Sequence, residues 1–201
     1  MKACLILAAV LAATASLQAD IIDWGCDDDG DGAIVINDAL TDLIPNGGDY
    51  TLDLTGAQYW GPGHLNGFFE SDTSTDPIVW LVETVENETT FDWTDYHIDI
   101  GMNQDFDITG VITPVGWTTV VTDPVPGQSL PAGAGIGYVG AVDYYYGGSG
   151  TEVVIGDSGD FGLKVEFVGT VEFCTSQYPT PEPASLTMLA LGALAVIRRR
   201  R

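Results

Sequence analysis

The feature that most restricts how this chain can fold is an alternation of apolar and polar residues with a period of two. Between Phe161 and Phe173 apolar side chains fill most alternate positions, and Gly169 interrupts the pattern. The alternation recurs in two earlier segments, 97–102 and 106–113. Because successive side chains of a strand point to opposite faces, this period predicts β-strands with one buried face. The segment from Phe161 is either one long strand or two strands bent at Gly169.

The remaining pattern between residues 20 and 178 also favours strands. A continuous apolar run at 78–82 predicts a strand that is covered on both faces. No long segment carries the 3.6-residue period of a helix, and turn-forming clusters such as 45–48 and 147–150 separate the apolar runs. We therefore predict an all-β fold, a single antiparallel β-sandwich domain of the Ig-like or jelly-roll type.

The N-terminal segment has the organisation of a secretory signal peptide. Lys2 supplies a positive charge, an apolar run follows, and small residues precede two candidate cleavage points, after Ala15 and after Ala19. Residues 1–19 are thus predicted to direct export, and residues 20–178 to form the exported domain.

The C-terminal segment 179–201 is equally distinct. It begins with a stiff stretch in which proline alternates with Thr180 and Glu182, continues with an apolar run at 184–197, and ends in four arginines. A helix of 14 residues spans ~21 Å, which is less than the ~30 Å hydrocarbon core of a membrane. The sequence therefore predicts a short hydrophobic helix that contacts the membrane at least transiently, with the arginines on the cytoplasmic side.

This tail resembles the PEP-CTERM sorting tail of exported bacterial proteins. The residues that carry the resemblance are Pro181, Glu182, Pro183, Arg198, Arg199, Arg200 and Arg201, together with the apolar run between them. The resemblance implies processing by an exosortase, a membrane transpeptidase that acts near the Pro-Glu-Pro. It also implies a final location at the cell surface or outside the cell, often with exopolysaccharide. Residues 87–101 are similar to a stretch of PEP-CTERM ectodomains, which implies shared β architecture without a known activity.

The charge of the chain excludes several functions. It has 29 acidic and 6 basic residues, a net charge of −23, and the stretch between Asp20 and Glu182 holds all the acids with Lys164 as its sole cation, a net charge of −28. Nucleic-acid binding depends on Lys and Arg contacts to phosphates, and so does most phosphoryl-transfer chemistry. Both functions are excluded for this domain.

Two cysteines remain after removal of the signal peptide. Cys26 lies near the start of the predicted domain and Cys174 near its end. In an oxidising compartment they are expected either to pair in a disulfide that joins the first strand to the last, or to remain two independent thiols.

An acidic loop offers a candidate metal site. Counted from Asp27, the spacing D-x-D-x-D-G resembles the calcium loop of EF-hand and dockerin proteins. The ligands that this resemblance implies are the side chains of Asp27, Asp29, Asp31 and Asp38 and the carbonyl of Ala33. The alternative is an acidic surface turn without a metal, and no other cofactor is expected.

The aromatic residues leave one binding function open. Tyr59 and Trp60, or Tyr144–Tyr146, are candidates for an exposed platform that stacks on sugars, and burial in the core is the alternative. His64 and His97 are the candidate imidazole bases, but neither has metal-type or catalytic spacing. We therefore predict a non-enzymatic surface or matrix protein. The alternative is a carbohydrate-binding module stabilised by calcium, and a glycan hydrolase ranks third.

Overall fold

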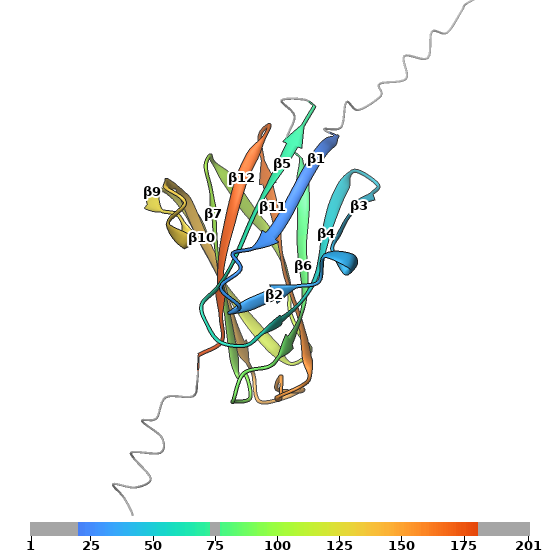
Figure 1. Cartoon of the computed structure of the whole chain (residues 1–201), viewed down its shortest axis with the longest axis vertical. Coiled ribbons are helices and arrows are strands. Elements are labelled where there is room, and N and C mark those ends of the chain that lie inside the picture. Colours follow the sequence, from blue (N-terminus) through green and yellow to red (C-terminus); the bar gives the residue numbers. More distant parts are fainter. Residues whose placement is uncertain (1–19, 73–76, 181–201) are drawn as a thin grey trace, which may run out of the picture.

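A computed structural model describes residues 20–72 and 77–180, which form two packed β-sheets (Figure 1). The strands of this described part are β1 (Ile21–Asp28), β2 (Ile34–Ile36), β3 (Asp42–Asn46), β4 (Asp49–Gln58), β5 (Gly63–Ser71), β6 (Ile78–Asn87), β7 (Asp95–Met102), β8 (Phe106–Ile112), β9 (Trp117–Ser129), β10 (Ile136–Tyr146), β11 (Ser158–Phe167) and β12 (Val171–Tyr178). Two 3-10 turns, η1 (Asp38–Leu40) and η2 (Pro131–Gly133), complete it. The predicted β-sandwich is confirmed.

The strand order departs from the expected antiparallel arrangement at one pair. One sheet has the order β1-β5-β12-β7-β10-β9, and the other has the order β2-β4-β6-β11-β8 with β3 paired to β4. β4 and β6 are parallel neighbours, whereas the other strand pairs of both sheets are antiparallel. The chain leaves β4, crosses to the opposite sheet as β5 and returns as β6, and this crossover allows two consecutive strands of one sheet to run in the same direction.

The alternating segments form the strands that they predict, with two refinements. Segments 97–102 and 106–113 lie in β7 and β8. The long alternating segment is divided at Gly169, whose φ of 71° turns the chain so that β11 and β12 belong to opposite sheets. The run at 78–82 lies in β6, where buried and half-buried residues alternate, so the expected burial of both faces is wrong. Its outer face is only partly covered, with Lys164 lying 5.5 Å above the ring of Trp80.

The core lies between the sheets and is dominated by aromatic rings. Tyr96 stacks on Phe161 with ring centroids 4.4 Å apart, and Trp93 stacks on Tyr96 at 5.2 Å. Phe69 packs between Phe167 and Phe173 in a second stack. Each of these rings is at least 96% buried. Aromatic burial of this extent supplies a large share of the hydrophobic stabilisation of a domain of this size.

The first and last described residues lie at opposite ends of the sandwich (Figure 1). β5 pairs with the start of β1 at Ser71 and with the end of β12 at Gly63, so the length of β5 separates the two ends. The predicted signal peptide and the predicted C-terminal helix lie outside the described residues. Within the described part, no helix is long and apolar enough to cross a membrane.

Candidate functional site

The chain leaves the sandwich through a fixed exit at the end of β12. Tyr178 is paired with His97 of β7, and two further residues, Pro179 and Thr180, follow in the described part. The backbone N–H of Thr180 donates a 2.8 Å hydrogen bond to Oδ1 of Asp95, and its hydroxyl donates to Oδ2 of the same carboxylate. The residue that opens β7 therefore holds the segment that immediately precedes Pro181.

A histidine, His97, lies between two aspartates beside this exit. His97 Nδ1 lies 2.7 Å from Oδ1 of Asp143, and Nε2 lies 3.7 Å from Oδ2 of Asp95. The contact with Asp95 is the largest effect on the pKa of His97 and raises it, and Asp143 raises it further. Burial of the ring acts in the opposite direction but is weaker than the effect of Asp95. Desolvation opposes ionisation of Asp95, but its contacts with His97 and Thr180 outweigh this effect and lower the pKa of the carboxyl. The imidazole ring also stacks on Tyr178 at 5.0 Å between ring centroids, which fixes the last side chain of the strand.

An aromatic pocket of about 470 Å³ opens beside the exit. Its lining residues are Tyr59, Trp60, Gly61, Pro62, Thr89, Thr90, Phe91, Ser176, Tyr178 and Pro179. Tyr59 is 47% exposed and Trp60 is 51% exposed, so the two predicted platform residues are on the surface and face the same pocket. A Cβ at Gly61 would lie 2.8 Å from Cβ of Tyr178, and therefore only glycine allows the loop to approach the end of β12 this closely.

A buried polar network lies beneath this pocket. Gln177 Nε2 donates to Oε1 of Glu83 at 2.7 Å, and the Tyr96 hydroxyl donates to Oε1 of Gln177 at 2.9 Å. The same hydroxyl lies 3.3 Å from Oε1 of Gln58, whose Nε2 donates to the carbonyl of Trp60. Oε2 of Glu83 is buried without a hydrogen-bond partner among the described residues. Burial raises the pKa of Glu83 from 4.5 to about 7, although the hydrogen bond from Gln177 opposes this shift.

The acidic loop does not assemble the predicted calcium ligands. Asp27 lies within β1, where it pairs with Asn66, and Asp38 lies in η1 beyond β2. The carbonyl of Ala33 already accepts hydrogen bonds from the backbone N–H groups of Tyr59 and Trp60. Among the described residues, the cluster of candidate metal ligands includes neither Asp27 nor Asp38, and the loop connects β1 and β2, which belong to opposite sheets.

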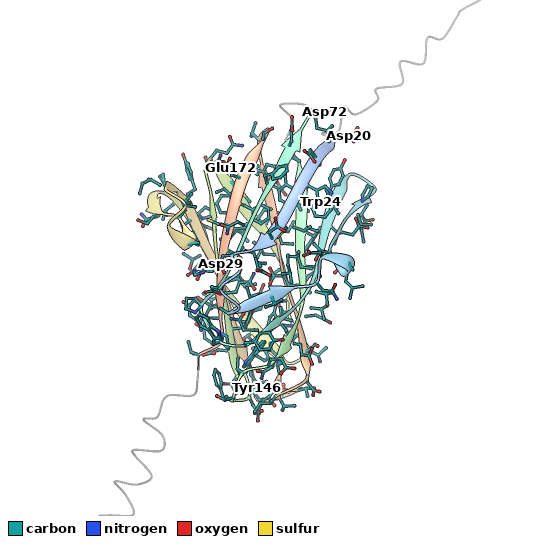
Figure 2. The ribbon with its side chains drawn as sticks, viewed as in Figure 1. Asp20, Trp24, Asp29, Asp72, Tyr146 and Glu172 are labelled. Carbon is teal, nitrogen blue, oxygen red and sulfur yellow. The ribbon has the colours of Figure 1, made fainter. Side chains whose placement is uncertain are left out.

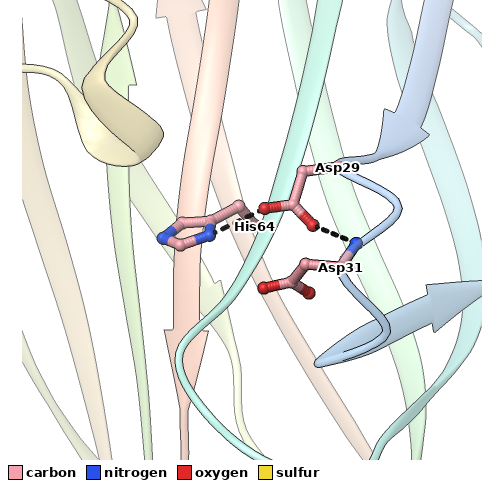
Figure 3. A group of neighbouring side chains, drawn as sticks. All are labelled: Asp29, Asp31 and His64. Atoms are coloured by element: carbon pink, nitrogen blue, oxygen red, sulfur yellow. Dashed lines mark hydrogen bonds and ion pairs between the residues drawn. The ribbon is translucent and has the colours of Figure 1, made fainter.

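Two of the predicted ligands do come together, with a residue that sequence spacing did not include. Asp29, Asp31 and His64 have ligand atoms within 4.8 Å of one another. Figure 3 shows the Asp29 carboxylate between the His64 ring, at 3.1 Å, and the backbone N–H of Asp31. Burial opposes ionisation of Asp29, but hydrogen bonds from Asp31 and His64 lower its pKa. Calcium takes oxygen ligands, so a set with an imidazole suits transition-metal cations better.

Of the two alternatives for the cysteines, the structure has two independent thiols and no disulfide between them. Cys26 and Cys174 are both free and buried. Strand β5 lies between them, with Gly67 opposite Cys26 and Asn66 opposite Cys174. Two strand spacings place their Cα atoms ~9–10 Å apart, beyond the ~7 Å limit for a disulfide. Gly67 and Asn66 are consecutive, so the two cysteine side chains also point to opposite faces of the sheet. Burial raises the pKa of Cys26 to about 12 and that of Cys174 to about 11.

The other aromatic candidates and the surface charges are distributed over the sandwich. Tyr144 is buried, where its hydroxyl donates to the carbonyl of Gly162, and Tyr145 is 40% exposed. Figure 2 shows Asp20 and Asp72 at one end and Tyr146 at the other, with Asp29 between them. Lys164, the sole cationic side chain of the described part apart from the histidines, lies 3.5 Å from Asp49. The acidic surface is thus almost without basic partners.

Comparisons with known proteins identify one segment of the chain. Residues 179–201 match the family model described as the PEP-CTERM protein-sorting motif. No curated protein and no solved structure matches the chain. The match begins at Pro179, so the described exit at Pro179 and Thr180 is the first part of the matched segment.

Proposed function

We propose that this chain, an exported protein with a PEP-CTERM sorting tail, acts as a non-enzymatic protein of the cell surface or extracellular matrix. The tail implies processing by exosortase, a membrane enzyme, and delivery to the surface. The observation that carries the proposal is the position of this motif, which follows directly on the last strand of a folded acidic sandwich.

The chemistry of the described residues supports a role without catalysis. His64 is engaged with Asp29, while His97 is held by Asp143 and stacked on Tyr178. In the described part, the two histidine rings form hydrogen bonds with aspartates, Asp29 for His64 and Asp143 for His97. A strongly acidic surface keeps a secreted protein soluble and repels anionic polymers unless cations bridge them. Association with exopolysaccharide is therefore proposed to depend on divalent cations.

Tail deletion tests the sorting function. A variant that lacks residues 181–201 is compared with the full chain and with a variant in which Arg198, Arg199, Arg200 and Arg201 are replaced by Gln. We expect the full chain to reach the surface with a shortened mass, and both variants to lose this delivery. Unchanged location and unchanged processing of the deletion variant would contradict the assignment.

The aromatic pocket favours a second candidate function, carbohydrate binding. Tyr59 and Trp60 combine high exposure with a lined pocket, and aromatic side chains with a polar tip suit contacts to sugars. In affinity electrophoresis through polysaccharide gels, we expect retardation that is lost in Trp60→Ala. Phe68→Ala is the matched control, because Phe68 is also exposed but lies in β5 and does not line the pocket. Equal migration of all three proteins with and without polysaccharide would exclude this function for the polymers tested.

A further inference from the structure

The chain is fastened to the body immediately before the sorting motif. Pro179 and Pro181 have no N–H, so Thr180 carries the one backbone donor among residues 179–181. This donor is used on Asp95, a residue that is 85 positions away in the sequence. The Thr180 hydroxyl binds the second oxygen of the same carboxylate. Two hydrogen bonds to one ionised carboxylate make a stronger contact than two hydrogen bonds between neutral groups.

The residues before Thr180 are held as well. Tyr178 is paired with β7 and stacked on His97, and Pro179 is buried against the aromatic pocket. No free residue therefore separates the folded body from Pro181. An enzyme that acts near the Pro-Glu-Pro must therefore bind a segment that is held to the folded body at Thr180, the residue directly before Pro181.

We propose that Asp95 is a positioning residue for tail processing, which holds Thr180 against the body and thereby restrains access of the membrane transpeptidase to the motif. The inference rests on the proposed sorting function. A transpeptidase binds several residues in extended form around the bond that it cleaves. Release of Thr180 would supply about 3.5 Å of additional extended chain between the body and the motif. Loss of the Asp95 contact should therefore accelerate processing.

Amide hydrogen exchange of the full chain tests the contact itself. By NMR, we expect the Thr180 amide of the natural sequence to exchange at least about tenfold more slowly than the same amide in Asp95→Ala. Retained protection of Ile98 and Gln177 in the variant serves as the control for folding. An unprotected Thr180 in the natural sequence would overturn the proposal.

Processing kinetics in an exosortase-containing host test the consequence. In pulse-chase labelling, we expect Asp95→Ala and Thr180→Val to be processed at least about threefold faster than the natural sequence, whereas Thr180→Ser, which keeps the hydroxyl, is processed at the natural rate. Thr180→Val changes no residue of the body, so it keeps the test valid if Asp95→Ala folds poorly. Processing of both variants at the natural rate or more slowly would overturn the proposal.

A spacer separates restraint from a general effect on folding. Six Gly and Ser residues inserted between Thr180 and Pro181 should accelerate processing by themselves, and Asp95→Ala should then have no further effect. An Asp95→Ala effect that persists with the spacer would contradict restraint at the exit. If the tail deletion leaves sorting unchanged, the proposed function fails, but the exchange result at Thr180 stands independently.

Discussion

Replacement of Glu83 by Gln should stabilise the protein at neutral and alkaline pH and not at acidic pH. Glu83 is 97% buried between the sheets, and its carboxylate has one hydrogen bond, from Gln177, with Oε2 left unpartnered. Its pKa rises from 4.5 to about 7 on folding because burial disfavours the charged form. The carboxyl is thus protonated in the folded state at pH values where the unfolded chain is already ionised.

The sign and magnitude follow from proton linkage. Below pH 4.5 both states are protonated, and Glu83 makes no pH-dependent contribution. As the pH rises from 4.5 through the folded-state pKa of about 7, the free energy of unfolding falls, because the unfolded state releases its proton first. A shift of this size corresponds to about 3 kcal/mol once the pH reaches 7 to 8. For a domain of this length, that loss equals roughly 6 to 12 °C in melting temperature.

Denaturant unfolding at pH 4 and pH 8 measures this difference. Glu83→Gln keeps an oxygen acceptor for Gln177 and cannot ionise, so we expect its free energy of unfolding to match that of the natural sequence within about 1 kcal/mol at pH 4 and to exceed it by about 3 kcal/mol at pH 8. Glu172→Gln, at an exposed position of β12, is the control for removal of one negative charge. An equal difference between Glu83→Gln and the natural sequence at both pH values would show that the ionisation of Glu83 does not affect stability.

Three further predictions address the charges, the thiols and the acidic loop. By NMR, the pKa of His97 should lie above 6.5, because Asp95 and Asp143 favour the charged imidazole, and Asp143→Asn should lower it. The contribution of these ion pairs to the free energy of unfolding is fully present below pH 6.5 and is lost as the pH rises through the folded-state pKa. A pKa at or below 6.5 would count against the ion pairs. Both Cys26 and Cys174 should be unreactive to a thiol reagent in the folded protein and should react as two equivalents after denaturation without reductant. If the denatured, unreduced protein has no reactive thiol, the two cysteines form a disulfide after all. Calcium should shift the melting temperature of the natural sequence no more than that of Asp29→Asn/Asp31→Asn, because the clustered ligands are two carboxylates and an imidazole and calcium needs six or more oxygen ligands. A calcium shift specific to the natural sequence would contradict this prediction.

Local patterns predicted the strands well because their cause is local. The alternation around 97–102 and 106–113 reflects side chains that point in turn to the core and to solvent, and β7 and β8 follow it closely. Gly169 was recognised as an interruption, but sequence alone does not show that the chain changes sheets there. The parallel pairing of β4 with β6 depends on the path of β5 through the opposite sheet, and no local pattern encodes that path.

The site residues were predicted where their role is visible in the adjacent sequence and missed where distant strands supply the partner. The sorting tail is a contiguous motif, and the surface exposure of Tyr59 and Trp60 agrees with one of the two alternatives. The two cysteines do not pair, because β5 lies between β1, which holds Cys26, and β12, which holds Cys174. The Asp95–Thr180 contact joins residues from the first half and the end of the chain, and one aspartate among many carries no signal for it.

The intact mass of the protein recovered from the surface of an exosortase-containing host tests the central claim most directly. We expect a mass that lacks the signal peptide, cleaved after Ala15 or Ala19, and lacks the C-terminal arginines after cleavage near Pro181–Pro183. A mass that still includes residues 184–201 would contradict processing of the tail, and with it the assignment of this chain as a substrate of an exosortase.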